Sequence, residues 1–578
     1  MASSSTSDDG FERFERLLEE WSRRDFLRRL GGTVAWAGFM AGGVGFLEAC
    51  GNSTSTGQQS ATPKKGGHVV EGSFSDIKGL NPVLISDTYS NTLTSLLFDT
   101  LLGVKANGDL TPLLAKSMPQ ISSDQTEITF TLQDGVKWSD GQALTADDVK
   151  FSFDLMFDPQ YKVVNSPRRG DLETHLQSIT VKDAHTVVFK TQKPWAPFLS
   201  NHAAQRQILP KHVLGPLAPA AINSADFNSA PSVASGAFKF VRWDKGQQVV
   251  LARNDNYFRG AGLLDQYVYK VLPDSVTLVN QLKTGEVDIG PVDPSLWDSL
   301  ATVDNLHRID PFGVAIFAFY AYNLDPAKHG GKLFGDKAVR QALLHALDRQ
   351  QMADSVYFKQ ATPADSIIPP ISWAHATPKT NSTFDKTKAE QMLDAAGWAK
   401  GADGIRTKGG LKLQFEMITN AGNKQRESLL QVMQQSWKDV GVDATPRLVQ
   451  FPQLVSQITN ERSFDVFLVG FSFDPDPDEN QLWSSNGAAP GGFNGFQYKN
   501  PAADRLWDEA ASTFDRSKRK QLYSQLQDIY AEDVPAPILV FNKGLWAYSK
   551  RVQSWSVGAF NQYGNRWFMK DTWVSDGK

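Results

Sequence analysis

A strand, a helix and a second strand follow one another in the second half of the chain. Apolar residues cluster or alternate in Leu411–Ile418 and again in Val442–Val449, which predicts two strands. The segment between them, Gln425–Val440, has the apolar spacing of an amphipathic helix, and Gly441 ends it. Two strands joined through a helix lie parallel in one sheet, with a right-handed crossover. The pattern therefore predicts an α/β lobe.

The first half of the chain is different, because apolar and polar residues alternate with period two in several short segments. Glu127–Leu132 predicts such a strand, which a turn ends at Gln133–Gly135. Thr145 and Asp148 form an expected capping box at the start of a helix. Two further hairpins are predicted, one with strands 178–181 and 186–189, the other with strands 238–241 and 248–251.

Composition excludes several functional classes. The chain has 578 residues and a formal net charge of -4, so it is long enough for several domains and has no excess of basic residues for nucleic acid. A single cysteine cannot form an internal disulfide, and the nine histidines lack metal-ligand spacing, so we expect no metal and no cofactor. No nucleophile elbow or phosphate loop is present, so we expect no enzyme. A secreted hydrolase is the alternative from another class.

The first fifty residues have the pattern of an export signal. Ser22–Arg28, with the pair Arg23 and Arg24, resembles the twin-arginine export motif. The uncharged stretch that follows, Leu30–Leu47, is diluted by glycine and is too weakly apolar for a stable membrane span. The alternative is an N-terminal helix of the fold. We expect residues 1–50 to be an export signal that the twin-arginine machinery reads.

The single cysteine of the chain, Cys50, is the last residue of this N-terminal segment. Leu47–Cys50 resembles a bacterial lipobox, although Glu48 departs from the small or apolar residue usual there. We therefore expect Cys50 to carry lipid, with cleavage nearby and no lipid as the alternative. Residues 51–66 are rich in Ser, Thr, Gln and Gly, which is typical of a flexible tether. The protein is then exported, in the periplasm or on the outer face of the membrane, where the lipid anchors it.

A series of motifs runs through the chain in a fixed order. They are DGVKWSDG at 134–141, TADDVKFS at 145–152, RNDNYF at 253–258, KTGEVD at 283–288, DKAVRQAL at 336–343 and ALDR at 346–349. This series resembles family 5 of the extracellular solute-binding proteins, the peptide- and nickel-binding components of ABC importers. The likeness covers nearly all of residues 67–570.

The resemblance implies an α/β fold of the two-lobe, periplasmic-binding-protein-like type II class, with an extra β-rich subdomain. The crossings between the lobes would lie at Tyr322–Asn323 and near Lys543, where a few residues absorb hinge motion. The expected ranges are 66–108, 236–322 and 541–578 for lobe one, 109–235 for the subdomain and 323–540 for lobe two.

An acidic turn at 470–480 holds the strongest candidate binding residues. Its alternating aspartates are spaced as in a calcium loop, but Glu479 and Ser485 stand where that loop needs glycine and a bidentate acid. A rigid turn is the structural alternative. In peptide binders of the family an aspartate here holds the ligand's α-ammonium, so the resemblance implies that role for Asp474 or for Asp476. A carboxylate suits it because a charge-assisted hydrogen bond offsets desolvation.

Other segments that border the family's cleft supply aromatic and amide side chains. Aromatic rings could pack against ligand side chains and amides could pair with its backbone. For each of them, core packing is the alternative. The resemblance implies a monomer that captures peptides and delivers them to the permease and ATPase subunits of an ABC importer, with oligosaccharides or nickel chelates as alternative ligands. The residues are Tyr89, Asn91, Tyr322, Asn323, Trp483, Phe493 and Asn494.

Overall fold

The computed structural model describes residues 62–489 and 492–578. Arg23, Arg24, Cys50 and most of the expected tether lie outside these residues. In the part that is described, no helix has the length and apolar character needed to cross a membrane.

A seven-stranded sheet carries the first lobe. Its strand order is β12-β22-β11-β1-β10-β9-β8, so β1 lies parallel between two strands that follow it much later in the chain. The hairpin predicted around Gly246 is confirmed as the antiparallel pair β8 and β9. The bounds are β1 His68–Ser73, β8 Phe238–Asp244, β9 Gln248–Arg253, β10 Gln266–Val271, β11 Ile289–Pro291, β12 Leu306–Arg308 and β22 Trp546–Ser549, with helices α3 Thr88–Leu97 and α7 Ser275–Thr284.

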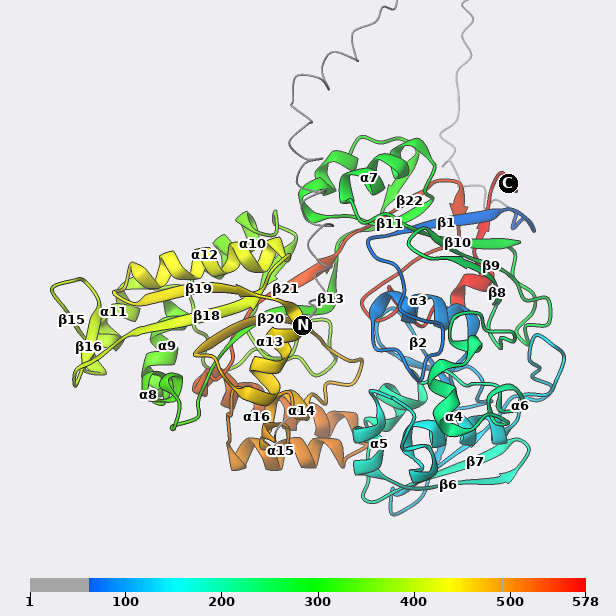
Figure 1. The fold of residues 1–578 in the computed structure, drawn as a ribbon, viewed down its shortest axis with the longest axis horizontal. Helices are drawn as coiled ribbons and strands as arrows, with labels where there is room; N and C mark the ends of the chain where they lie inside the picture. The colour runs from blue at the N-terminus through cyan, green and yellow to red at the C-terminus, as the bar shows by residue number, and fades with distance from the viewer. Residues whose placement is uncertain (1–61, 490–491) are drawn as a thin grey trace, which may run out of the picture. The chain divides into compact units, whose positions relative to one another are not determined.

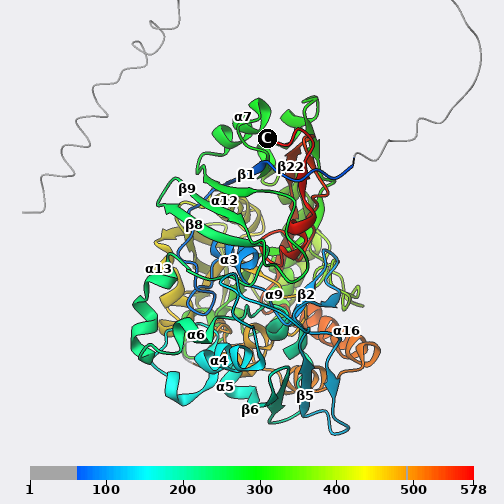
Figure 2. The ribbon, with the colours of Figure 1, turned by 90° about the vertical axis from the view of Figure 1, so that its right-hand side faces the viewer.

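A four-stranded antiparallel sheet, β4-β5-β7-β6, forms the subdomain. The hairpin predicted at 178–189 is confirmed as β6 and β7. Figure 2 shows this sheet and its helices below the seven-stranded sheet. The bounds are β2 Leu102–Val104, β3 Leu110–Pro112, β4 Gln120–Ile121, β5 Glu127–Thr131, β6 Leu176–Asp183, β7 Thr186–Thr191, α4 Ala146–Phe157, α5 Arg169–His175, α6 Lys211–Leu214 and a π-helix at Phe198–Ala203.

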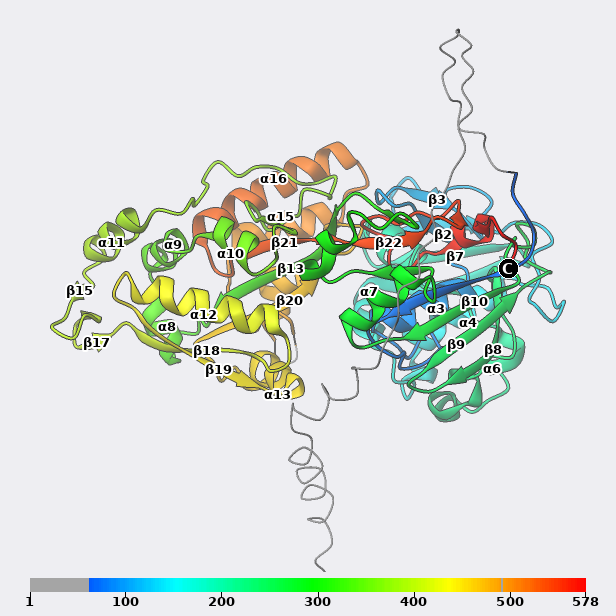
Figure 3. The same cartoon turned by 90° about the horizontal axis from the view of Figure 1, so that it is seen from above.

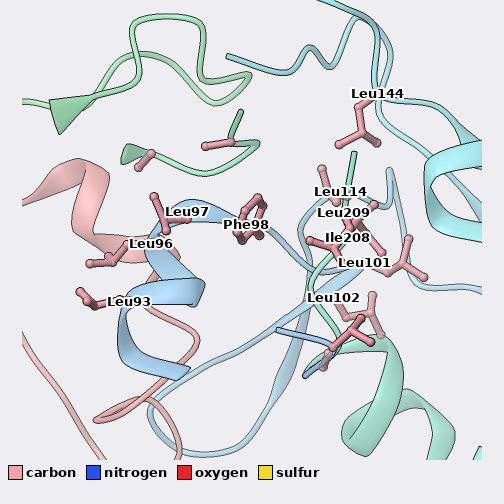
Figure 4. Close-up of a cluster of buried hydrophobic side chains, with 14 of the residues drawn as sticks. Leu93, Leu96, Leu97, Phe98, Leu101, Leu102, Leu114, Leu144, Ile208 and Leu209 are labelled. Atoms are coloured by element: carbon pink, nitrogen blue, oxygen red, sulfur yellow. The ribbon is translucent and has the colours of Figure 1, made fainter. Parts of the chain in front are cut away.

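One continuous apolar core joins this subdomain to the first lobe. The predicted capping box is present at the start of α4, where the Thr145 N–H donates to Asp148 Oδ2 over 2.8 Å. Figure 4 shows Leu93, Leu96 and Leu97 of α3 in the same buried cluster as Leu144 and Ile208 of the subdomain. Burial of apolar side chains from both parts favours their folding as one body.

A six-stranded sheet, β14-β21-β13-β20-β18-β19, carries the second lobe. Helix α12 packs on one face and α15 and α16 on the other (Figure 1), and each face has its own buried cluster. The bounds are β13 Phe312–Tyr322, β14 Ala361–Pro363, β18 Gln414–Asn420, β19 Asp443–Val449, β20 Val466–Ser472, β21 Ile538–Gly544, α8 His329–Phe334, α9 Lys337–His345, α10 Arg349–Ser355, α11 Lys386–Ala395, α12 Lys424–Lys438, α13 Phe451–Ser456, α14 Asn480–Trp483, α15 Pro501–Ala511 and α16 Arg516–Asp533. Short strands lie outside these sheets, namely β15 Ala399–Lys400, β16 Arg406–Lys408, β17 Leu411–Lys412, β23 Val552–Gln553 and β24 Trp573–Val574.

The predicted strand–helix–strand unit is confirmed in this sheet. Strands β18 and β19 pair in parallel along their whole length, and α12 connects them. Gly441 has a φ of 87°, the left-handed conformation that glycine adopts readily, and it ends the turn after α12. Leu429, Met433 and Trp437 of the helix are buried against the sheet.

The chain crosses between the two large sheets twice. It leaves the first sheet between β12 and β13 and returns between β21 and β22, and β13 and β21 run side by side (Figure 3). Tyr322 is the last residue of β13, inside the second sheet, so the first crossing precedes the expected Tyr322–Asn323. Phe312–Tyr322 reads as a continuous apolar run, and such a run does not indicate which of two sheets it joins.

Candidate functional site

Two connected recesses lie between the two large sheets and the subdomain. Each contains about 990 Å³ of space, part of it open to solvent, and they share Ile316, Gln562 and Tyr563. We call the first the Asp474 recess and the second the Trp546 recess. Besides the shared residues, the Asp474 recess is lined by 82, 85–88, 91, 168, 205–207, 472–475, 559–560 and 564–565. The Trp546 recess is lined by 74, 291–292, 294, 314, 317–318, 357, 360, 423, 425–426, 470 and 542–546.

Asp474 reaches the first recess because β20 ends at Ser472 and the acidic turn begins there. The turn is held by a hydrogen bond in which the Asp474 N–H donates to Glu479 Oε1 over 3.0 Å. The Asp474 side chain is half-buried, and no Lys, Arg or His of the described residues lies within 4.0 Å of it. Burial, followed by the nearby Asp474 charge, raises the pKa of Glu479 well above its usual value. Asp474 is therefore a carboxylate that forms no ion pair with another described residue, and its charge acts on Arg206 of the same recess.

Asp476, two residues further on, has a different environment. It is 2% exposed, and Arg519 donates to both of its oxygens over 2.7 Å and 2.6 Å. Arg519 also donates to the Ala510 carbonyl and to the Tyr523 hydroxyl, both over 2.9 Å. This pair anchors the acidic turn to α16. Of the two carboxylates that the sequence left open, Asp474 lines the recess and Asp476 supports the turn.

Of the two predicted residues of α3, Asn91 lines the same recess, and Tyr89 packs against Tyr563, which lines it. The Asn91 amide donates to the Tyr563 carbonyl over 3.2 Å and accepts from Gln207 over 3.1 Å. The Tyr89 ring meets the Tyr563 ring edge-on, with centroids 6.3 Å apart. Asn91 thus ties the first lobe to the subdomain at the recess wall, and Tyr89 supports the wall from behind Tyr563.

Four predicted residues are fully buried in the second lobe. Their side chains have 0% exposure, so they pack in the core in this conformation. Asn323 and Asn494 donate to backbone carbonyls, and Trp483 packs against Phe319, Phe496 and Tyr530 in tilted and edge-on contacts. Direct ligand contact by these side chains stays a prediction. The four are Tyr322, Asn323, Trp483 and Asn494.

Phe493 is placed differently from these four. Its side chain is 52% exposed, and its ring meets Phe471 of β20 edge-on with centroids 5.8 Å apart. An exposed aromatic ring loses water when another apolar group covers it, so Phe493 is free to contact a partner. The predicted site residues are thus divided between the recess, the surface and the core.

Two arginines of the Asp474 recess were not predicted from the sequence. Arg168 lies just before α5 and Arg206 follows the π-helix, and both line the recess with Gln205 and Gln207. The signal for three of these was a polar triplet, Gln-Arg-Gln, between the apolar pairs 203–204 and 208–209. Such a triplet inside an apolar run indicates polar side chains that face solvent or a polar recess while their apolar neighbours are buried in the core.

The residues beneath the Trp546 recess were not predicted from the sequence either. Trp546 Nε1 donates to Gln562 Oε1 over 3.2 Å, and the Gln562 carbonyl accepts from Arg566 Nε over 3.1 Å. Arg566 is fully buried and forms a two-fold ion pair with Glu71, over 2.8 Å and 3.2 Å. Since Glu71 and Arg566 are far apart in the sequence, only the folded chain brings this support together.

The described residues contain no group of three His, Cys, Asp or Glu side chains close enough to hold a metal ion. The recesses instead offer the carboxylates of Asp87 and Asp474, arginines, amides and aromatic rings. This donor set suits hydrogen bonding and ion pairing with an organic ligand that carries charge.

Most of this chain is similar in sequence to known proteins. The model of the bacterial extracellular solute-binding proteins, family 5, matches residues 109–493. The oligopeptide-binding protein AppA of Bacillus subtilis is 31% identical over 520 residues, which cover 88% of this chain and 93% of AppA. Protein XP55 of Streptomyces lividans is 28% identical and covers 89% of this chain and 90% of its own length.

Solved structures give the same result for the fold. AppA from Bacillus subtilis in complex with a nonapeptide superposes with a TM-score of 0.75 and 29% identity, over 89% of this chain and all of that one. NikZ from Campylobacter jejuni in complex with Ni(L-His) has a TM-score of 0.74 and 26% identity, over 87% of this chain and 99% of that one.

Proposed function

Because this chain belongs to family 5 of the bacterial extracellular solute-binding proteins, we propose that it captures peptides outside the membrane and delivers them to the permease of an ABC importer. AppA, which is similar over nearly its whole length, is an oligopeptide-binding protein whose structure holds a nonapeptide. The protein acts by binding and release, and it is not an enzyme.

The observation that carries this proposal is the unpaired carboxylate of Asp474 in a recess that both lobes line. A free peptide has an ammonium at its amino end, and that ammonium can donate to Asp474 when the lobes enclose it. The gain from this charge-assisted bond is present in the closed state and absent in the open one, which is the condition for a ligand to shift the equilibrium toward closure.

A thermal-shift screen tests this function. Alanine-based peptides from dipeptide to nonapeptide, oligosaccharides and nickel–histidine complexes are added separately to the purified protein. A ligand at about 100 times its Kd adds about 2.7 kcal/mol to the free energy of unfolding, so the melting temperature should rise with peptides. A rise with oligosaccharides or nickel complexes and none with peptides would contradict the peptide assignment, and hydrolysis of an added peptide would contradict the absence of enzyme activity.

Mass spectrometry of small molecules that copurify with the protein gives an independent test. Binding proteins of this kind enclose their ligand, so a bound peptide can survive purification. Release of peptides by denaturation supports the proposal. Release of a sugar or of a metal complex in stoichiometric amount contradicts it.

The export and anchoring of the protein are part of the proposal. Arg23 and Arg24 direct export by the twin-arginine machinery, and acylated Cys50 holds the receptor near its permease. Replacing both arginines with lysine should leave precursor inside the cell. Replacing Cys50 with alanine should release the protein from the membrane fraction, and a mature N-terminus other than lipid-modified Cys50 would contradict the anchor.

A further inference from the structure

The second lobe touches the subdomain at the turn between α15 and α16. The Ala196 N–H, which follows β7 of the subdomain, donates to the Ala511 carbonyl at the end of α15 over 2.9 Å. Figure 1 shows α15 and α16 beside α5 of the subdomain, away from β13 and β21, where the chain crosses between the large sheets. We call residues 511–516 the 511–516 turn. It joins the two lobes at a place where the chain does not cross between them.

Phe514 is the large apolar residue of this turn. Its side chain is half-buried and packs against the apolar core that the first lobe shares with the subdomain. Within residues 62–489 and 492–578, neither buried cluster of the second lobe's own sheet includes Phe514. Opening of the lobes would expose the ring to water, so its burial favours closure. That gain does not depend on a ligand.

Two ion pairs flank Phe514, and each joins the second lobe to the subdomain. Lys193 Nζ lies 3.5 Å from Asp508 Oδ1, and Arg516 Nη1 lies 3.5 Å from Asp109 Oδ1. The four side chains are 46–59% exposed, so each pair contributes little to stability and is screened by salt. The pairs align the two surfaces, and the apolar contact supplies most of the attraction.

The second lobe supports the 511–516 turn from behind. The Arg516 guanidinium lies 4.9 Å from the centroid of the Trp373 ring, and the guanidinium of Arg519 lies 5.3 Å from the same centroid. The Trp373 ring in turn meets Tyr523 of α16 edge-on, with centroids 5.9 Å apart. Packing within the second lobe therefore sets the shape of the turn, so the turn presents Phe514 to the subdomain without a ligand.

We propose that the 511–516 turn is a latch, which holds the two lobes closed over the recesses when no ligand is bound. The inference goes beyond the proposed function, because it concerns the empty protein. A ligand too large for the solvent-open parts of the recesses enters only after the lobes have parted, so the latch slows its entry and its release. Salt screens the flanking ion pairs, so the latch weakens as the ionic strength rises.

Disulfide trapping in the empty protein tests the latch. Cys50→Ser removes the only cysteine of the full chain, and Ala196→Cys with Ala511→Cys then adds one pair of thiols. The backbone hydrogen bond between these residues suits the Cα separation of about 4.4–6.8 Å in disulfides. Unfolding and refolding remove any copurified ligand before glutathione buffer oxidises the thiols. The cross-link should form within about threefold of the rate of a pair that never separates, Glu127→Cys with Lys190→Cys across β5 and β7.

Phe514→Ala in the same background should slow the cross-link about fivefold or more, because closure loses the burial of the ring. Phe384→Ala removes an exposed ring elsewhere in the second lobe, so it is the matched control and should change nothing. Small-angle X-ray scattering without the added cysteines should give a larger radius of gyration for empty Phe514→Ala than for the wild type. Thermal unfolding checks that each variant is folded; if Phe514→Ala is not, Lys193→Gln with Arg516→Gln replaces it.

Two outcomes overturn the latch. One is a cross-link in the empty protein that forms more slowly than the stated range, since the lobes would then be mostly open. The other is a cross-linking rate and a radius of gyration that the folded latch variant leaves unchanged. Neither measurement contains a ligand, so failure of peptides to bind is a separate result that overturns the proposed function alone.

Discussion

Arg519 and Asp476 form a buried, two-fold ion pair. The guanidinium donates to both carboxylate oxygens, over 2.7 Å and 2.6 Å, and the side chains are 7% and 3% exposed. Through this pair α16 holds the acidic turn in place. Asp474, two residues before Asp476 in the same turn, faces the recess. One of two similar aspartates is thus structural, and the other is available to a ligand.

Replacing Arg519 with methionine should destabilise the protein by about 3–5 kcal/mol, because Asp476 would stay buried without its partner. The double variant Arg519→Met/Asp476→Leu should recover much of that loss, since no charge remains buried. Denaturant unfolding measures both. Lys116→Met, which breaks the exposed Lys116–Asp134 pair, is the control and should cost less than about 1 kcal/mol. A double variant as unstable as the single one would contradict this account.

Replacing Asp474 with asparagine should weaken binding of peptides that have a free amino end. The side chain keeps its size and loses the charge that attracts an ammonium, so we expect a loss of about tenfold or more. Peptides with an acetylated amino end should lose little. Calorimetric titration gives both affinities, and Asp134→Asn, an exposed change in the subdomain, is the control. Equal losses for free and acetylated peptides would remove Asp474 from this role.

The contribution of Asp478 to stability should fall as the pH rises from about 4 to 7. Burial, and next the charge of Asp476, raise the pKa of Asp478 to about 7, while one of its oxygens has no hydrogen-bond partner. The folded protein keeps this proton where the unfolded chain releases it, so the contribution of Asp478 is lost toward pH 7. Glu479, whose pKa burial also raises, acts in the same direction. Burial lowers the pKa of His202 and of His345, and these two act in the opposite direction, so only the difference between variants isolates Asp478.

Asp478→Asn should therefore stabilise the protein at pH 8 and leave it unchanged near pH 4. The full pKa shift of Asp478 corresponds to about 4 kcal/mol of unfolding free energy. Water entry and relaxation of the turn reduce this effect, so we expect Asp478→Asn to add about 1–2 kcal/mol at pH 8. Urea unfolding across this pH range measures the difference. Asp528→Asn is the control, because an exposed ion pair with Lys379 lowers the pKa of Asp528 instead. A pH dependence identical to that of the wild type would exclude this role for Asp478.

Gly441→Ala should cost about 2–4 kcal/mol. Its φ of 87° is unfavourable for alanine, and the added Cβ would lie 3.0 Å from the Gly404 carbonyl oxygen and 3.1 Å from Arg406 Cγ. Gly422→Ala is a matched control, because Gly422 has a φ of 86° and nothing within 4 Å of the new Cβ. It should cost about 1–2 kcal/mol, from conformation alone. Denaturant unfolding that gives equal losses would show that crowding at Gly441 contributes nothing.

The elements that sequence analysis predicted well are those that local pattern determines. The parallel pair β18 and β19 followed from two apolar segments around an amphipathic helix, and the capping box at Thr145 from two residues three positions apart. Hairpins β6–β7 and β8–β9 followed from period-two alternation around short turns. In each case the residues that make the element are neighbours in the chain, so their spacing carries the information.

The residues that line the Asp474 recess were predictable only in part. The acidic turn and α3 were expected at the cleft, and the structure places Asp474 and Asn91 there. Arg168 and Arg206 were missed, because an arginine in a polar segment has the same sequence pattern whether it faces a recess or solvent. Likewise the apolar run of β13 did not indicate that this strand belongs to the second sheet.

The sequence by itself determined the family, the α/β character of the second lobe and the presence of a β-rich subdomain, since apolar periodicity and ordered motifs are local properties. Only the tertiary structure decided which of Asp474 and Asp476 is free, because Arg519 reaches one of them from α16 after folding. The same holds for the arginines opposite Asp474, which the subdomain and the lobes bring into one recess. Pairing of charges depends on distances of a few ångströms between remote segments, and packing of the whole core sets those distances.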